Sequence, residues 1–529
     1  MSDSTAERRT RISSLIVMGA TFTSRLFGIV RTRVLAQVFG SGATADVINF
    51  TFNIPNNFRK LFGEGAVNSA LIPAFSALHS EEERSARQRL FSLLCTYQIL
   101  LFVPIVLISY VWRESLIAFL SDFDAQQITL GGQLLAPFML YLTFISLAAI
   151  FGGVLQSHHS FLIAYVSPLF FSLLVIAGVL TLTPIMGPMS MAVSTVLGGG
   201  MQAAVNYLGV RRHGYRLRFA LDGGGTALAK VLKAWALVSI GMGVQVATQL
   251  ITYRFASTLS VGSVTALANS TIFHQTPYGI FFNAIAAVSL PLLSTAHTLG
   301  QHKRVQTITA GALGALASLL LPSSIILFFL SRESVSTILQ AGLFTHESAL
   351  LTAQVLRTYL IFLTPMAFYA MMLRLGYSAH RHRMMTRVVV VQNGVDIALM
   401  WILLKSGVGI AALPLANGIS VIGGFIALCI ILADLYPIHR DRGLRRRLGR
   451  IILANVPLLS AGLLYRHLGT VWYHDGSTWK NLALLAILGL GAVALVLASY
   501  HVAKIPLIEL LKQSDEGDLG LLGIDDLEV

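Results

Sequence analysis

The stretch Ile54–Ser76, IPNNFRKLFGEGAVNSALIPAFS, decides the fold of this chain because it is both apolar and charged. Arg59, Lys60 and Glu64 fall within six residues, with apolar sequence on both sides. A loop does not need so many apolar residues, and a simple membrane span does not hold three charges. Whether this stretch crosses a membrane also sets the side on which every later loop lies.

The composition is that of a membrane protein. The chain has 529 residues, of which 55% are hydrophobic and only 12% are charged, and its mean hydropathy is +0.72. A soluble protein would carry about twice that charged fraction. The apolar residues come in long blocks, whereas an outer-membrane barrel would alternate polar and apolar positions. We therefore expect an all-α polytopic membrane protein.

The net charge of +14 does not indicate a nucleic-acid partner. The basic runs are short, and apolar blocks separate them, as expected for basic residues gathered in cytoplasmic loops. Cys95 and Cys429 both lie inside apolar blocks, so neither a disulfide framework nor a metal cluster is expected. The N-terminus has a basic start and an apolar run without a small-residue cleavage site, so we interpret it as retained and not as a signal peptide.

A helix needs about 20 mostly apolar residues to cross the hydrocarbon core. On this criterion the sequence predicts about 14 spans. They lie at 14–37, 46–76, 90–111, 132–156, 160–183, 187–209, 231–257, 262–296, 305–330, 350–379, 385–405, 408–434, 451–469 and 481–503. The second and eighth are too long for simple spans, which predicts bent or broken helices.

The distribution of Lys and Arg predicts the orientation. With the N-terminus inside, the cytoplasmic segments hold 23 basic residues and the opposite loops hold five. This ratio predicts that both termini are cytoplasmic. If residues 46–76 were a loop, the basic runs at 210–218 and 440–450 would face outward, so the stretch is predicted to cross the membrane.

A short internal repeat predicts a duplication. AVNSALIPAFS (66–76) and AIAAVSLPLLS (284–294) share a Pro and a closing Ser at the same positions, so that Pro73 corresponds to Pro291. We expect two six-helix lobes in parallel repeat around a central cavity, plus two C-terminal helices, an arrangement typical of transporters. The predicted parts are 1–220 (spans 1–6), 221–437 (spans 7–12), 438–504 (spans 13 and 14 with a basic linker) and 505–529 (an acidic cytoplasmic tail).

The basic linker HRDRGLRRRLGR (439–450) allows two interpretations. It either binds anionic lipid head groups or simply anchors the topology, and the second is favoured. We assign no function to the tail SDEGDLGLLGIDDLEV (514–529).

Charges inside predicted spans mark the candidate site, because a buried charge costs about 2.5–3.5 kcal/mol at a helix centre and tends to face a cavity. The first two spans carry five cations and two carboxylates, namely Arg25, Arg31, Arg33, Asp46, Arg59, Lys60 and Glu64. The excess of positive charge favours an anionic ligand, and the planar Arg fork suits phosphate. For Arg33 and Lys60 we favour mutual pairing or an interfacial position.

Local geometry supports a cluster. Arg25 and Arg31 are about 120° apart on a helix, and Gly28 between them permits a bend. Lys60 and Glu64 form an i,i+4 pair. Pro55 removes a helical hydrogen bond, and we expect the following Asn56 and Asn57 to satisfy the freed backbone groups.

The residues Ser24–Ser76 resemble the MurJ (MviN) family, the proposed lipid II flippases of bacterial cell-wall synthesis. The chain matches its patterns S-R-x-x-G-x-x-R, F-G-x-G-x-x-x-D, P-N-x-x-R and E-G-A with a closing x-P-x-x-S. PYGIFFNAIAAVSLPLLS (277–294) and PMAFYA (365–370) extend the likeness.

This resemblance implies a fold of the multidrug/oligosaccharidyl-lipid/polysaccharide exporter type and an undecaprenyl-diphosphate-linked disaccharide pentapeptide as substrate. It implies that Arg25, Arg31 and Arg59 bind the diphosphate. Asp46 and Glu64, with Lys60, would be gating or ion-pair positions. It also implies a groove for the polyprenyl tail on the last two spans and alternation between inward-open and outward-open states.

One departure from the family pattern concerns the eighth span. Related sequences often carry Arg-x-x-Glu before its proline, and Ile272 and Gln275 stand there in this chain. Arg254, at the end of the seventh span, and His274 are candidates to replace the missing positive charge.

A carboxylate also occurs in the eleventh span. Asp396, with Asn393 three residues before it, is either a Na⁺ or proton site that couples transport to an ion gradient or a helix-packing hydrogen-bond partner. The residues leave both possibilities open.

Three functions compete. The first is flipping of lipid II at the bacterial inner membrane, with lipid II, membrane lipids and peptidoglycan synthesis proteins as partners. The second is cation-coupled export of small molecules or of other lipid-linked oligosaccharides. The third is a scaffold that uses the basic linker and the tail. No Walker motif, metal spacing or nucleophile elbow indicates an enzyme or a cofactor, so Na⁺ or H⁺ coupling, substrate gradients or the membrane potential would drive movement.

Overall fold

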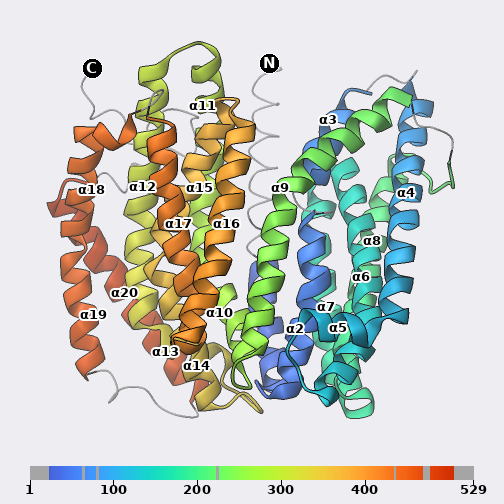
Figure 1. Cartoon of the computed structure of the whole chain (residues 1–529), viewed down its shortest axis with the longest axis horizontal. Coiled ribbons are helices and arrows are strands. Elements are labelled where there is room, and N and C mark those ends of the chain that lie inside the picture. Colours follow the sequence, from blue (N-terminus) through green and yellow to red (C-terminus); the bar gives the residue numbers. More distant parts are fainter. Residues whose placement is uncertain are drawn as a thin grey trace. The chain divides into compact units, whose positions relative to one another are not determined.

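The computed structural model describes residues 19, 23–61, 66–78, 83–221, 225–433, 437–468 and 477–505. These residues are helical and hold no strand, as Figure 1 shows. Glu64, the basic N-terminal residues and the acidic tail lie outside the described residues. The prediction of an all-helical chain is confirmed.

The helices divide by their contacts into two units. The first unit, Met1–Thr265 with Ala341–Thr345, contains a helix over residues 23–39 and the start of α10. It also holds α2 (Ala43–Arg59), α3 (Ala66–Ser76), α4 (Arg84–Val111), α5 (Arg113–Leu120), α6 (Ala125–Ser157), α7 (Phe161–Met186), α8 (Met189–Arg212) and α9 (Gly225–Ser257). Because α9 groups with the first unit, this contact boundary lies later in the chain than the predicted lobe boundary at residue 220.

The second unit is Ala266–Gln340 with His346–Val529. It begins with α10 (Ser263–Pro277), η3 (Tyr278–Phe282), α11 (Asn283–Thr298), α12 (His302–Phe329), α13 (Ser331–Leu339), α14 (His346–Ile361) and α15 (Leu363–Ser378). It continues with α16 (His382–Lys405), η4 (Gly409–Ala411), α17 (Ala412–Ile431), η5 (Ile438–Arg440), α18 (Arg442–Ala454), α19 (Val456–Leu468) and α20 (Thr478–Val502).

Many of these helices are long and apolar enough to cross a membrane. Nine described spans pass this test, and α14 with α15, bent by 48°, adds a tenth. Each of the fourteen predicted segments contains helix in its described part, and the chain is a multi-pass membrane protein. The number fourteen itself stays a prediction.

The internal repeat is visible in the helix bounds. We call the spacing between Pro73 and Pro291 the repeat offset. Both ends of α4 and α12 differ by this offset, and so do the last residues of α2 and α10. The short helices α5 and α13, which the sequence did not predict, begin at the same offset, and a π-helical turn starts at Lys60 and again at Tyr278. The repeat therefore extends over the backbone, while its arrangement as two six-helix lobes stays a prediction.

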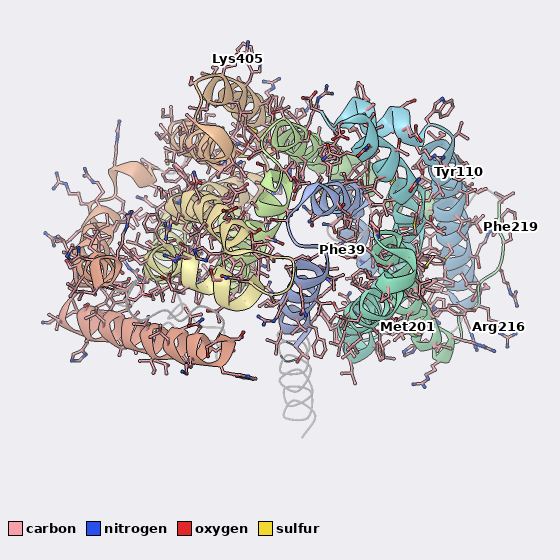
Figure 2. The ribbon with its side chains drawn as sticks, turned by 90° about the horizontal axis from the view of Figure 1, so that it is seen from below. Phe39, Tyr110, Met201, Arg216, Phe219 and Lys405 are labelled. Carbon is pink, nitrogen blue, oxygen red and sulfur yellow. The ribbon has the colours of Figure 1, made fainter. Side chains whose placement is uncertain are left out.

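Within the first unit, the segment that follows α8 lies along α4. The side chain of Gln88 donates to the backbone oxygen of Arg216 (2.6 Å) and accepts from its N–H (2.9 Å). The N–H of Ala220 donates to the Thr96 hydroxyl at 3.2 Å. Phe219 is 73% exposed, and in Figure 2 it lies at the periphery near Arg216. These bonds fasten the strap over residues 215–221 to α4.

The last helices of the second unit are fastened to α12. In Figure 1, α18 and α19 follow each other along the chain, and α20 lies beside them. The buried hydroxyl of Tyr500 donates to the backbone oxygen of Ser318 (3.0 Å) and accepts from the side-chain amide of Asn455 (2.8 Å). One side chain of α20 thus bonds both α12 and the junction of α18 and α19.

Candidate functional site

The described residues of the stretch Ile54–Ser76 belong to two helices and a π turn. Its first part completes α2 and continues as a π turn at residues 60–61, and the residues from Ala66 onward form α3. Pro55 lies inside α2 and Pro73 inside α3. Because π turns in α-helices often occur at functional sites, the π turn at residues 60–61 makes the region around Arg59 a candidate site.

The two asparagines after Pro55 contact the cations of this stretch. Asn56 Oδ1 accepts from Arg59 Nε at 3.3 Å, and Asn57 Oδ1 accepts from Lys60 Nζ at 2.9 Å. We expected these amides to bond the backbone groups freed by Pro55; that prediction is wrong among the described residues, where Asn57 Nδ2 has no hydrogen-bond partner. Neutral amide oxygens orient both cations and leave their positive charge intact.

Arg31 and Arg59 lie close enough to interact electrostatically, and Tyr141 lies within the same range. Both arginines are half-buried, whereas Arg25 is exposed. Among the described residues no carboxylate forms an ion pair with Arg31. The first unit therefore holds two neighbouring guanidinium groups in an apolar setting, which favours an anionic ligand.

Asp46 joins α2 to the turn before α10. Its carboxylate accepts from the backbone N–H groups of Gly262 (2.7 Å) and Thr265 (2.8 Å), and from the Thr265 hydroxyl (2.7 Å). Only 3% of Asp46 is exposed. The sequence suggested a gating or ion-pair role, and the partners are N–H and O–H groups at a helix N-terminus, where a carboxylate is favoured.

The two candidates for a compensating cation make other contacts. Arg254 donates to the Phe119 oxygen and lies 6.0 Å from the centre of the Phe119 ring, which fastens α9 to α5. His274 is 4% exposed and stacks on Tyr359, with ring centres 4.3 Å apart. These contacts give both side chains a packing role.

The sequence reasoning missed a cation of the second unit. Arg374 of α15 lies 4.7 Å from the centre of the Phe282 ring, and Tyr278 stacks on Phe282 at 4.8 Å. Both aromatic residues belong to the π-helical turn η3. An Arg inside the predicted span 350–379 was the signal that could have identified it.

Asp396 is 1% exposed and lies between α16 and α17. Its Oδ2 accepts from the Asn417 amide at 2.8 Å, and its Oδ1 has no hydrogen-bond partner among the described residues. The Asn393 amide donates to the Val389 oxygen and to Gln392 Oε1. The packing bond, one of the two alternatives that the sequence left open, is present, and among the described residues one carboxylate oxygen has no hydrogen bond and could take a proton or cation.

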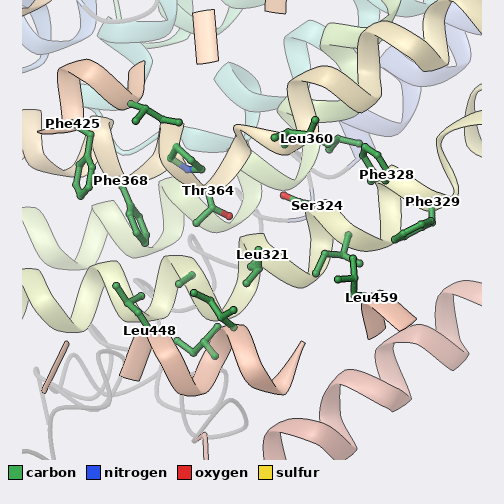
Figure 3. A pocket seen from close by; sticks show the side chains of 17 residues that line it. Leu321, Ser324, Phe328, Phe329, Leu360, Thr364, Phe368, Phe425, Leu448 and Leu459 are labelled. Carbon is green, nitrogen blue, oxygen red and sulfur yellow. The ribbon is translucent and has the colours of Figure 1, made fainter. Parts of the chain in front are cut away.

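The second unit has an open-sided apolar cavity of about 620 Å³. Helices α12, α14, α15, α17, α18 and α19 contribute its walls. Figure 3 shows Phe328, Phe368 and Phe425 around it, with Ser324 and Thr364 as polar side chains. Such a lining suits a hydrocarbon chain and not a polar head group.

A second apolar cavity of about 380 Å³ lies between α12, α19 and α20. It shares Ile325 and Phe329 with the first cavity. The walls of the two cavities therefore have residues in common, and the last helices contribute to both.

The long apolar helices, the internal repeat, the paired guanidinium groups and the apolar cavities define a multi-pass membrane protein of the transporter class. The family model described as "Lipid II flippase MurJ" matches residues 35–484. This chain belongs to that family, whose description is that of a transporter and not of an enzyme.

Similar proteins carry the same family name. A protein of Borreliella burgdorferi named probable lipid II flippase MurJ is 26% identical over 93% of this chain and 97% of its own. One of Thermotoga maritima with the same name is 27% identical over 85% and 91%.

Solved structures agree in fold. A lipid II flippase MurJ in an inward closed conformation matches with a TM-score of 0.75 at 21% identity, over 93% of this chain and all of that one. An inward-facing multidrug transporter of the MATE family matches with a TM-score of 0.65 at 12% identity, over 83% of this chain and 98% of that one. At these identities the likeness concerns the fold alone.

Proposed function

We propose that this protein flips lipid II, the undecaprenyl-diphosphate-linked peptidoglycan precursor, across the bacterial inner membrane by alternating access. Family membership supports the substrate. The observation that carries the proposal is the Arg31 guanidinium, whose Cζ lies 5.2 Å from the centre of the Phe171 ring and which interacts electrostatically with Arg59. In the described part of the chain Arg31 has no carboxylate partner, so the two adjacent cations are stabilised when a diphosphate enters.

The diphosphate is the natural ligand of this pair. A guanidinium presents a planar fork of donors that matches phosphate oxygens, and low local polarity strengthens the attraction. Arg25, which is exposed, is assigned to the same site. Lys60, whose Nζ is held by Asn57, and Glu64 are assigned to gating together with Asp46.

The polyprenyl tail is assigned to the apolar cavities of the second unit. Their lining is almost entirely hydrocarbon and aromatic. Transfer of each CH₂ group from water contributes about 0.8 kcal/mol, so a long isoprenoid chain gains much from any apolar groove. The last two spans, in α18 to α20, supply part of these walls.

Orientation and location complete the proposal. Both termini are assigned to the cytoplasm, two lobes of six spans to residues 1–220 and 221–437, and spans 13 and 14 to residues 438–504. Membrane lipids and peptidoglycan synthesis proteins are the proposed partners. Asp396, one oxygen of which has no hydrogen-bond partner among the described residues, is the proposed site of Na⁺ or H⁺ coupling.

The proposal is tested by Arg31→Ala in cells depleted of their own lipid II flippase. We expect this variant, inserted at normal levels, to fail to support peptidoglycan synthesis. Arg33→Ala is the matched control, because it removes the same group two residues along the same helix and should support growth. Full growth of cells that depend on Arg31→Ala would contradict the assignment of Arg31 to the diphosphate.

A second function, cation-coupled export of small molecules, is favoured by one observation, the Asp396 oxygen that the described residues leave without a hydrogen bond. It predicts that Asp396→Asn abolishes activity while Arg31→Ala does not. Lipid II exposure on the outer face of depleted cells separates the two functions. Unchanged exposure would favour the exporter.

A further inference from the structure

The guanidinium of Arg31 lies over an aromatic ring. Its Cζ is 5.2 Å from the centre of the Phe171 ring. Phe171 belongs to α7 and is 7% exposed, so water is largely excluded from this contact. A cation over a desolvated ring face is held more firmly than one at an exposed site.

Phe171 is one of four rings that contact one another in a chain. Its ring centre lies 5.4 Å from that of Tyr141, and the Tyr141 ring centre lies 6.1 Å from that of Phe52. Phe52 also contacts Phe138 edge to face at 5.5 Å. We call Phe52, Phe138, Tyr141 and Phe171 the aromatic wall. It joins α2, which carries Arg59, to α6 and α7.

Two glycines of α8 pack against the aromatic wall. A Cβ atom on Gly198 would lie 2.9 Å from Phe171 Cδ2 and 3.0 Å from the Phe171 backbone oxygen. A Cβ atom on Gly199 would lie 2.6 Å from Tyr141 Cδ2. The next glycine, Gly200, has no such neighbour within 4 Å among the described residues. The backbone of α8 therefore reaches the two rings only because these positions lack a side chain.

An aromatic partner differs from a carboxylate in its effect on the charge of Arg31. A carboxylate would neutralise the guanidinium, whereas the ring stabilises it through its quadrupole and adds no net charge. Within the described ranges Arg31 forms no ion pair. Contact with the ring also restricts the rotamers of a long side chain before a ligand arrives, which lowers the entropic cost of binding.

We propose that Phe171 and Tyr141 are positioning residues that hold the Arg31 guanidinium in place for a diphosphate without adding a compensating negative charge. This inference rests on the proposed function of Arg31. It assigns no substrate contact to the two rings, since Phe171 and Tyr141 are only 7% and 3% exposed. In this inference Gly198 and Gly199 allow the backbone of α8 to pack directly against the aromatic wall.

The test is the dissociation constant of the purified full-length protein for undecaprenyl diphosphate. Phe171→Leu should weaken binding about tenfold, and Phe171→Tyr, which keeps the ring, should restore it to within about twofold. Phe151→Leu is the matched control. It removes a ring that packs on Phe91 at 5.8 Å, and it should bind as the wild type does.

Two further outcomes decide between a positioning role and a merely structural one. In an Arg31→Met background, Phe171→Leu should cost much less than in the wild type, because the cation that the ring holds is absent; an equal loss in both backgrounds would overturn the inference. Gly199→Ala should weaken binding several-fold while Gly200→Ala leaves it unchanged. Equal binding by these two variants would overturn the role assigned to Gly199.

The inference and the proposed function fail in different ways. If Arg31→Ala weakens binding but Phe171→Leu binds as the wild type does, the positioning role is wrong and the diphosphate site stands. If Arg31→Ala itself binds undecaprenyl diphosphate with wild-type affinity, the diphosphate site falls and the positioning role falls with it.

Discussion

The two repeats share a backbone but differ in their side chains. At the π-helical turn of the first repeat stand Arg59 and Lys60, and at the equivalent positions of the second stand Pro277 and Tyr278. The helices α4 and α12 keep the repeat offset at both ends, α2 and α10 keep it where they end, and α5 and α13 where they begin. Helix bounds are set by packing and by proline, so they persist when charges change.

Under the proposed function the two units divide the labour. In the first unit Arg31 lies near Arg59 and against an aromatic wall, whereas the second unit has the apolar cavities and places Glu333 near its own interacting cations, Arg332 and Arg357. A lipid with a charged head group and a long hydrocarbon chain needs both kinds of surface. The following predictions test this contrast.

The largest expected effect comes from Asp46, whose equivalent in the second repeat is the apolar Val264. Asp46→Ala leaves two backbone N–H groups and one hydroxyl without their buried acceptor, so the free energy of unfolding should fall by about 4 kcal/mol. Denaturant unfolding in detergent measures it. Asp122→Ala, at an exposed acid, should stay within about 0.5 kcal/mol of the wild type. Unchanged unfolding of Asp46→Ala would contradict the role of this bond network.

The next effect concerns the cavity of the second unit. Leu321→Trp adds volume to a lining residue, so affinity for undecaprenyl diphosphate should fall about tenfold. Affinity for farnesyl diphosphate, whose chain is short, should not change. Leu100→Trp, on an exposed face of α4, is the control. Equal losses for both ligands would place the tail outside this cavity.

Asp396 provides a smaller effect. If Na⁺ binds its Oδ1, Na⁺ at ten times its dissociation constant should stabilise the wild type by about 1.4 kcal/mol. Asp396→Asn should lose this stabilisation and keep its folding, since the amide oxygen still accepts from Asn417. Thermal unfolding in sodium against choline chloride measures the difference. No sodium effect on the wild type would leave Asp396 as a packing residue or a proton site.

The smallest effect is expected at the strap over residues 215–221. Gln88→Ala removes the two solvent-exposed hydrogen bonds to Arg216 and a third to the Ser92 hydroxyl within α4, so the free energy of unfolding should fall by about 1 kcal/mol. Thermal unfolding of the full-length protein measures this change. A much larger loss would mean that the strap is part of the core of the first unit.

The sequence predicted the fold well because hydropathy and proline act locally. The long apolar blocks correspond to helices, and the repeat offset read from two prolines recurs in the helix bounds. The short helices α5 and α13 were not predicted because each has only eight or nine residues between long spans. Such lengths depend on tertiary packing more than on propensity.

The site was predicted only in part. Arg31 and Arg59 were identified by charge, and their proximity agrees with that interpretation. The aromatic wall was not predicted, because Phe52, Tyr141 and Phe171 come from three helices that no local pattern brings together. The Asp46 bonds were missed for the same reason, since their donors, Gly262 and Thr265, lie at the N-terminal end of α10, which is far from α2 in the sequence.

The most direct test of the division of labour compares two ligands on one variant. We predict that Arg31→Ala combined with Arg59→Ala weakens binding of undecaprenyl diphosphate and of farnesyl diphosphate by the same factor, about a hundredfold, because both ligands carry the same head group. Wild-type affinity of the double variant for either ligand would contradict the assignment of the diphosphate to the first unit.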